Sequence, residues 1–343
     1  MTSVPVRFGI IGAGVAAETH ARELAAIDNA RLAAVYARSE QKAAAFAAAF
    51  SVPKHFSSLA HFLTDPELDA IIITSPNALH LEHALASASA GKHVIVEKPL
   101  EITRNRADRI VEACQRAGVS LFVIYQRVYS SSVQQARADI LAGKLGNVFM
   151  VNLIDNQYRA PAYYQNDAWR GTRQFEGGGC VITQSTHLID LAQYLLGPVS
   201  SLYASTATVM HNIETEDAAV AILHFAGGVL GTLSSSTAAY PGLRHLIIIN
   251  GTQGSLIING EYDQILFRQT RDEGVTHAAP QNFTFADTQN PRDYPTQGQR
   301  RQLQAITDRL AQGEVNIDER ALLSVSVVEG IYRSAEGRRT VTL

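Results

Sequence analysis

The strongest constraint on the fold is a regular alternation of short apolar runs with helical runs over residues 1–125. The apolar runs read VRFGIIG, RLAAVYA, DAIIITS, HVIVEK and SLFVIY. They are almost continuously apolar, which is typical of strands covered on both faces. Helical segments over 16–27, 40–50, 78–91 and 104–118 lie between them, and several end at a glycine, a common helix stop. The pattern predicts an α/β domain over residues 1–125 with a doubly wound parallel sheet.

After residue 126 the pattern changes, which predicts a second domain over residues 126–343. One helix over 131–146 leads into long alternating segments that begin at residues 147, 199, 217, 228, 244, 254 and 264. Turn signals such as NGTQG and NGEYD separate several of them. We expect a large antiparallel sheet of six or more strands, covered on one face by a helix over 179–196. A polar loop over 270–297 and two closing helices follow.

Composition excludes several classes of protein. The chain has 343 residues and a net charge of −3, so no basic excess indicates a nucleic-acid surface. The longest apolar runs are too short to cross a bilayer, and the N-terminus reads directly into a strand without a signal pattern. Cys114 and Cys180 lie far apart and lack metal-ligand spacing. We expect a cytoplasmic protein with two reduced thiols, no metal, no membrane contact and no nucleic-acid partner.

The first strand ends in a glycine-rich turn. The stretch FGIIGAGVAAETHA places Gly12, Gly14 and Ala17 in a G-x-G-x-x-A arrangement. In a strand–turn–helix context these positions permit a tight turn, close approach of a pyrophosphate and tight helix packing. The helix N-terminus supplies N–H groups to the anion. The sequence therefore predicts a Rossmann dinucleotide site at Gly12, Gly14, Val15, Ala16 and Ala17.

The end of the second strand indicates which dinucleotide binds. The stretch VYARSEQK has Arg38 and Ser39, and no acidic residue before Glu40. A guanidinium and a hydroxyl suit a 2′-phosphate, whereas a carboxylate would repel it. We therefore expect a preference for NADP(H). NAD(H) remains the alternative, on which Arg38 is only a solvated residue at a helix start.

Two further stretches carry candidate catalytic groups. GKHVIVEKPL ends a predicted strand with Glu97, Lys98 and Pro99, where ligands bind in parallel sheets. GGGCVITQSTHLID opens on three glycines and places Thr183, His187 and Asp190 at spacings of four and three residues. On an α-helix this spacing puts the three side chains on one face. The structural alternative for His187 is a buried histidine, and for Asp190 it is a hydrogen bond to a neighbour.

The chain resembles the Gfo/Idh/MocA oxidoreductases, the glucose–fructose oxidoreductase and inositol dehydrogenase family. The resemblance covers nearly the whole chain and rests on the order of GIIGAGVAAETHARELA, TSPNALHLEHALASASAGKHVIVEKPL, AGKLGNV and WRGTRQFEGGGCVITQSTHLIDLAQYLLG. It implies a Rossmann domain joined to an α/β domain with a large open antiparallel sheet. It further implies hydride transfer between a nicotinamide and a sugar or polyol carbon. Such proteins are commonly dimers or tetramers that associate through the sheet.

The resemblance also assigns roles to single residues. Lys98 matches the lysine that binds the reacting hydroxyl, and His187 matches the usual general acid/base. Many members have an aspartate where this chain has Thr183, and a glycine where it has Ser185. The TQ version with a preceding WRGT looks like the branch of UDP-N-acetylglucosaminuronate 3-dehydrogenases.

The remaining candidates follow from position in the predicted fold and from the resemblance. The expected cofactor contacts, besides the glycine turn, Arg38 and Ser39, are Thr74, Ser75, Pro76, Asn77, His80, Glu97, Lys98, Gln126, Trp169 and Arg170. The expected substrate contacts are Lys98, Tyr158, Tyr163, Gln184 and His187, and the catalytic residues are Lys98, His187 and Thr183. For Asn77 and His80 the alternative is local hydrogen bonding at a helix start.

Two other functions stay open. One is an NAD-linked dehydrogenase of inositol or another free polyol. The other is a nonenzymatic NADP-binding sensor that contacts a protein partner. A sensor needs neither Lys98 nor His187, so the presence of both favours an enzyme.

Overall fold

The computed structural model describes residues 4–279, 284 and 291–343. The chain forms two compact units. The first contains Met1–Gln126 and Thr296–Leu322, and the second contains Arg127–Pro295 and Leu323–Leu343.

The first unit is built on a six-stranded parallel sheet with strand order β3-β2-β1-β4-β5-β6. Its strands are β1 (Val6–Ile11), β2 (Ala30–Tyr36), β3 (Lys54–Phe56), β4 (Ala70–Ile73), β5 (His93–Glu97) and β6 (Leu121–Ile124). The doubly wound parallel sheet predicted from the sequence is confirmed. Strand β3 was not predicted because three residues are too few to give a recognisable apolar run.

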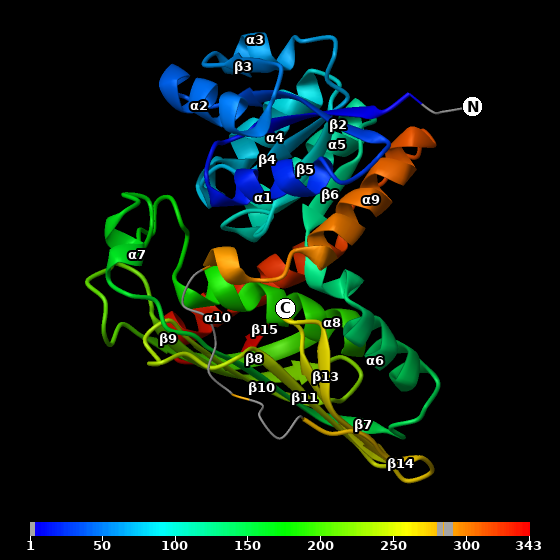
Figure 1. Cartoon of the computed structure of the whole chain (residues 1–343). Helices are drawn as coiled ribbons and strands as arrows, with labels where there is room; N and C mark the ends of the chain where they lie inside the picture. Colours follow the sequence, from blue (N-terminus) through cyan, green and yellow to red (C-terminus); the bar gives the residue numbers. More distant parts are fainter. Residues whose placement is uncertain (1–3, 280–283, 285–290) are drawn as a thin grey trace. The chain divides into compact units, whose positions relative to one another are not determined.

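Helices cover the two faces of this sheet. They are α1 (Val15–Leu24), α2 (Glu40–Phe50), α3 (Leu59–Leu63), α4 (His80–Ser89), α5 (Arg104–Ala117) and, from far along the chain, α9 (Gln297–Ala311). Short 3₁₀ turns η1 (Asn77–Leu79) and η2 (Gln126–Tyr129) follow β4 and β6. Leu303 and Ile306 of α9 lie in the same buried core as Phe8 and Ile10 of β1, and Figure 1 shows α9 running beside the sheet. The core of the first unit is therefore completed by the returning chain.

The second unit contains a nine-stranded sheet in the order β14-β13-β12-β11-β7-β10-β9-β8-β15. The strands are β7 (Val148–Asn156), β8 (Val199–Ala207), β9 (Ala218–Phe225), β10 (Leu230–Ser236), β11 (Leu246–Gly251), β12 (Gly254–Asn259), β13 (Gln264–Thr270), β14 (Gly274–His277) and β15 (Val341–Thr342). All neighbouring strands of this sheet pair antiparallel except β7 and β10, which pair parallel. The expected large antiparallel sheet is thus confirmed as mostly antiparallel.

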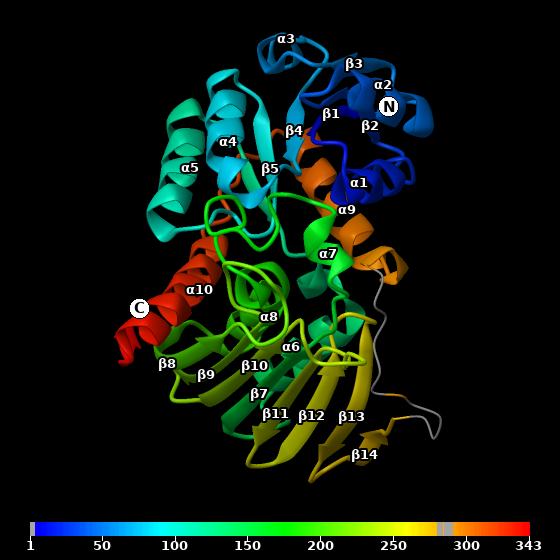
Figure 2. The same ribbon diagram turned by 90° about the vertical axis from the view of Figure 1, so that its left-hand side faces the viewer.

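The two faces of this sheet differ. Helices α6 (Ser131–Leu141), α8 (Thr186–Leu196) and α10 (Arg320–Gly337) lie over one face (Figure 2). Along β9, Ala221 and Leu223 are buried, whereas the alternate residues Val220 and Ile222 are more than half exposed. This alternation indicates that the opposite face is open and partly apolar.

Two sequence-based expectations need correction. The helix expected over 179–196 begins with one π-helical turn, η3 (Val181–Ser185), before α8 starts at Thr186. Thr183 therefore does not continue the α-helical face of His187 and Asp190. The loop expected over 270–297 contains β14, and residues 280–283 and 285–290 of it lie outside the described residues.

Candidate functional site

The carboxyl ends of the parallel strands gather most of the predicted cofactor residues at one edge of the first unit's sheet. The glycine turn follows β1, Arg38 and Ser39 follow β2, Thr74–Asn77 follow β4, Lys98 follows β5, and Gln126 follows β6. Strands β1 and β4 are neighbours although β2 and β3 lie between them in sequence, so the strand order reverses there. Ligands bind at this reversal in open parallel sheets.

Gly12 and Gly14 play different structural roles. Gly12 has φ +114°, and a Cβ added to it would collide with the Thr74 side chain, so the tight turn requires glycine. Gly14 is the N-cap of α1 and has an extended backbone. A Cβ added to Gly14 would meet no atom within 4 Å. The space in front of the α1 N-terminus is therefore open, and the cradle fits a pyrophosphate.

The end of β2 carries one exposed cation close to a capping hydroxyl. Arg38 is exposed, and the Ser39 hydroxyl accepts a hydrogen bond of 3.3 Å from the amide of Lys42 at the start of α2. The nearest acidic residue in sequence, Glu40, pairs with His55 at 3.0 Å. Glu40 is thus engaged by a side chain of β3, while Ser39 still has a hydroxyl hydrogen to donate.

His83 of α4 lies beside Ser75 and was not predicted. The Ser75 hydroxyl and His83 Nδ1 are 2.9 Å apart. Burial, with smaller contributions from the charges of His80 and Arg38, lowers the pKa of His83 to about 4. His83 is therefore neutral at pH 7 and adds no positive charge beside Arg38.

His80 connects the loop after β4 to the loop after β5. It is buried, and its two ring nitrogens lie 2.9 Å from the carbonyl oxygens of Pro99 and Ser75. Burial lowers its pKa. These contacts agree with the local hydrogen bonding considered as the alternative for His80, and they fix the backbone on either side of the expected nicotinamide contacts. Asn77 is buried at the start of η1.

Glu97 and Lys98 end β5 at the same edge. The Glu97 carboxylate lies 2.8 Å from His20 Nε2 of α1 and accepts a 3.1 Å hydrogen bond from the Lys98 amide. Burial would raise the pKa of Glu97, but the hydrogen bond and charge of His20, together with Lys98, lower it. Glu97 therefore stays ionised, and it fixes the backbone that presents the half-buried Lys98, whose peptide bond to Pro99 is cis.

The second unit holds the other catalytic candidates on η3 and α8. His187 is the second residue of α8 and is buried. Asp190 accepts a 3.4 Å hydrogen bond from Ser324 of α10, which agrees with the structural alternative for Asp190, a hydrogen bond to a neighbour. Thr183, within the π-helical turn, donates a 2.8 Å hydrogen bond to Glu176 Oε1.

Glu176 supplies a carboxylate next to Thr183. It is buried, and its other oxygen accepts a hydrogen bond from the Gly171 amide. Burial raises its pKa, opposed by these hydrogen bonds and by Arg170. Glu176 was not predicted from the sequence, although its place directly before the glycine run was an available signal.

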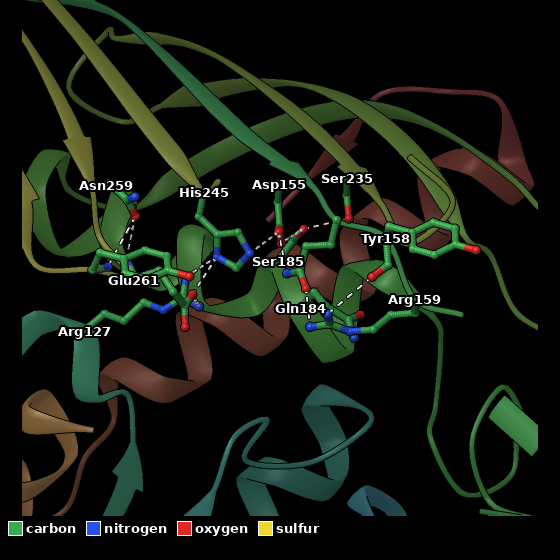
Figure 3. Close-up of polar contacts among 12 residues, drawn as sticks. Arg127, Asp155, Tyr158, Arg159, Gln184, Ser185, Ser235, His245, Asn259 and Glu261 are labelled. Carbon is green, nitrogen blue, oxygen red and sulfur yellow. Dashed lines mark hydrogen bonds and ion pairs between the residues drawn. The ribbon is translucent and has the colours of Figure 1, made fainter. Parts of the chain in front are cut away.

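A buried polar cluster lies beneath the π-helical turn (Figure 3). Asp155 of β7 accepts a 2.6 Å hydrogen bond from Ser185, and its other oxygen lies 2.9 Å from His245 Nε2. The Nδ1 atom of His245 lies 2.8 Å from Glu261, which also pairs with Arg127. Burial would raise the pKa of Asp155, but His245, Ser185 and Gln157 hold it well below its usual value. The cluster fixes Ser185, two residues before His187.

The predicted aromatic and arginine contacts lie in the segment before the glycines. The Arg170 guanidinium lies over the rings of Tyr163 and Trp169, at 4.2 Å and 4.6 Å from their centroids. Its Nη1 atom also donates to the Tyr163 hydroxyl at 2.5 Å. Tyr158 instead packs edge-on against Tyr240, and Figure 3 shows its hydroxyl pointing away from the Asp155 cluster.

Neither a metal centre nor a membrane-spanning helix is present among the described residues. Within residues 4–279, 284 and 291–343, no group of three or more His, Cys, Asp or Glu side chains is arranged to hold a metal ion. In the same part of the chain, no helix combines the length and apolar character needed to span a bilayer.

Comparison with known families agrees with this architecture. Residues 6–125 match the oxidoreductase family with an NAD-binding Rossmann fold, and residues 133–257 match the Gfo/Idh/MocA C-terminal domain. The family resemblance expected from the sequence is confirmed.

Individual relatives are similar over most of the chain. The myo-inositol 2-dehydrogenase of Thermotoga maritima is 27% identical over 276 residues, covering 78% of this chain and 80% of that protein. The D-xylose 1-dehydrogenase (NADP(+)) 2 of Haloferax volcanii is 27% identical over 345 residues, covering 98% and 99%. The structure of the WlbA dehydrogenase from Bordetella pertussis, in complex with NADH and UDP-GlcNAcA, matches with a TM-score of 0.83. That match has 29% identity and covers 99% of both chains. The chain therefore belongs to the Gfo/Idh/MocA family and is an NAD(P)-dependent oxidoreductase.

Proposed function

We propose that this enzyme prefers NADP(H) and transfers a hydride to or from a hydroxyl-bearing carbon of a sugar, nucleotide sugar or polyol. In this proposal the N-terminal domain, residues 1–125, holds the dinucleotide, and residues 126–343 hold the substrate. The observation that carries the cofactor preference is the exposed Arg38 beside Ser39, with Glu40 engaged by His55. A guanidinium at this place pairs with a 2′-phosphate, and no carboxylate among the described residues forms an ion pair with Arg38.

The proposed cofactor contacts follow the edge of the sheet. The pyrophosphate binds the N-terminal amides of α1 in front of Gly14. The nicotinamide half contacts the residues after β4, β5 and β6 and, from the second unit, Trp169 and Arg170. The residues in question are Thr74, Ser75, Pro76, Asn77, His80, Glu97, Lys98 and Gln126. When bound, the nicotinamide supplies or accepts the hydride at its C4 atom.

The proposed acid–base groups are Lys98 and His187. In oxidation His187 accepts the hydroxyl proton, while the Lys98 ammonium binds the same oxygen and stabilises its developing negative charge. In reduction the same groups donate. Thr183 acts with them as a positioning residue, because its hydroxyl is committed to the Glu176 carboxylate at 2.8 Å. Tyr163 and Gln184, whose polar groups lie 3.4 Å apart, contact the substrate, and Tyr158 completes the proposed set.

The cofactor preference is tested by fluorescence titration of the purified protein with NADPH and NADH. Wild type should bind NADPH more tightly, and Arg38→Ala should lose most of that preference. Arg31→Ala is the matched control, because Arg31 is an exposed arginine near the opposite end of the same strand. A preference for NADH in wild type would contradict the assignment of Arg38 and favour an NAD-linked polyol dehydrogenase.

The enzymatic assignment is tested by absorbance at saturating cofactor with a panel of sugars, nucleotide sugars and polyols. Lys98→Met should bind cofactor almost normally and lose most turnover. Strong residual turnover in Lys98→Met would contradict the role of Lys98. Binding of dinucleotide without any absorbance change across the panel would favour a sensor.

We also propose that the chain forms a homodimer or homotetramer through the open face of the nine-stranded sheet. Val220, Ile222 and Tyr203 are 59%, 53% and 42% exposed there, around a shallow hollow of about 500 Å³. Contiguous apolar surface of this kind is typical of a subunit interface. Light scattering should give a multiple of the 37.2 kDa chain mass, and a monomer at micromolar concentration would contradict the proposal. The buried free thiols Cys114 and Cys180 support a cytoplasmic location.

A further inference from the structure

We propose that Arg159, Tyr163 and Gln184 form a subsite for an anionic group of the substrate. The group is either the carboxylate of a sugar acid or a phosphate of a nucleotide sugar. This inference rests on the proposed function and narrows its substrate class. All three residues belong to the second unit, and the contacts that support the subsite lie within that unit.

The first observation is a buried arginine without a counter-charge. Arg159 follows β7 and is 5% exposed. Its guanidinium donates to Gln157 Oε1 at 2.5 Å and to the Tyr158 carbonyl at 3.4 Å, and both acceptors are neutral. Its Nε atom is buried and has no hydrogen-bond partner among the described residues.

The surrounding carboxylates are committed elsewhere. No Asp or Glu oxygen in the described part of the chain lies within 4.0 Å of the Arg159 guanidinium. Asp155 reaches it only through the amide of Gln157, whose Nε2 atom donates to Asp155 at 2.7 Å. An arginine keeps its charge at every physiological pH, and a buried charge is costly unless it is paired. The buried positive charge of Arg159 is therefore paired only when an anion binds beside it.

The second observation is an acceptor left open beside this charge. Gln184 is 6% exposed, its Oε1 atom has no partner among the described residues, and its Nε2 atom lies 3.4 Å from the Tyr163 hydroxyl. The Arg159 guanidinium lies 5.7 Å from the centroid of the same tyrosine ring. The Tyr163 side chain thus lies near both groups, one of which has an unpartnered donor, Arg159 Nε, and the other an unpartnered acceptor, Gln184 Oε1.

The two unpartnered atoms, Arg159 Nε and Gln184 Oε1, are complementary to a sugar that carries an anionic group. Arg159 can donate to a carboxylate or phosphate oxygen, and Gln184 Oε1 can accept from a neighbouring hydroxyl. Gln184 precedes His187 by three residues, so a sugar held here lies about one turn of backbone from the proposed general base. Figure 3 shows Arg159 and Gln184 beneath the same stretch of sheet as the Asp155 cluster.

Direct binding measurements test the subsite independently of turnover. The full chain, saturated with its preferred dinucleotide, is titrated calorimetrically with four probes: D-glucose, D-glucuronate, UDP and UDP-glucuronate. The variants are Arg159→Met, Arg159→Lys and the control Arg271→Met, which removes an exposed charge after β13. Dinucleotide affinity is measured first for every variant, so failure of the cofactor site is recognised separately.

We expect Arg159→Met to weaken binding of the anionic probes about tenfold or more and to leave glucose and dinucleotide binding unchanged. Arg159→Lys should lose less, and it replaces the Met variant if that protein does not fold. A loss on both glucuronate probes but not on UDP identifies a carboxylate. A loss on both UDP probes but not on glucuronate identifies a phosphate. Equal affinity of wild type and both Arg159 variants for every anion would overturn the proposal. So would the failure of every anionic probe to bind wild type that binds dinucleotide normally.

Discussion

Replacing Gly14 by alanine separates protein stability from cofactor binding. The Gly14 backbone is extended, with φ −100° and ψ −170°, which alanine adopts without strain. The added methyl group meets no atom within 4 Å. Where alanine fits, this change stabilises a protein by about 0.4–1 kcal/mol, because it restricts the unfolded chain. We therefore expect Gly14→Ala without ligand to be at least as stable as wild type.

The same methyl group occupies the space in front of the α1 N-terminus, where the pyrophosphate is proposed to bind. We expect dinucleotide binding to weaken about tenfold or more, or about 1.4 kcal/mol. The weaker dinucleotide binding also reduces the extra stability that the ligand gives to the folded protein. At a dinucleotide concentration about 100 times the wild-type Kd, binding stabilises wild type by about 2.7 kcal/mol, but a tenfold weaker variant by only about 1.4 kcal/mol.

The assay is unfolding with and without NADPH, together with a fluorescence titration. Gly12→Ala is the contrasting variant, since its positive φ and collision with Thr74 should cost about 2 kcal/mol without any ligand. A Gly14→Ala protein that binds NADPH as tightly as wild type would refute the reasoning, because the open space would then not be the pyrophosphate path.

Three further predictions concern the second unit. Ser185→Ala removes a buried hydrogen bond to ionised Asp155 and should reduce the free energy of unfolding by about 1.5–3 kcal/mol in urea; an unchanged midpoint would contradict this. Gly179→Ala places a methyl group against the Glu216 backbone oxygen and should cost about 3 kcal/mol or more, so recovery of stable protein would show that the backbone can move. Because its folded pKa is lowered, Asp155 contributes stability that is present above pH ~4 and is lost as the pH falls further. On acidification from pH 5 to pH 3, the free energy of unfolding should therefore fall more for wild type than for Asp155→Asn. Equal decreases in the two proteins would contradict the lowered pKa of Asp155.

Local sequence patterns predicted the first unit well, because each of its signals is contained in a few neighbouring residues. These signals are the glycine turn, the apolar strands and the polar residues at strand ends, and each can be recognised in a short stretch of sequence. The parallel pairing of β7 with β10 could not be predicted in the same way, since it joins strands separated by α8 and a hairpin.

The candidate site in the second unit was predicted only in part. His187 and Thr183 were found because they stand in one short motif. The Asp155 cluster was missed because its members come from residues 155, 185, 245 and 261, which only the folded sheet brings together. Arg159 was missed for a related reason. An arginine in a sequence is normally solvated, and only its burial without a carboxylate makes it informative.

The return of α9 to the first unit bears on how this protein is made. Translation delivers all six strands of the parallel sheet early, but Leu303 and Ile306 leave the ribosome only after most of the second unit. Until then the apolar surface that these two side chains cover in the finished protein stays exposed on the nascent chain. The nucleotide-binding half is thus among the first parts to be synthesised and among the last to be completed.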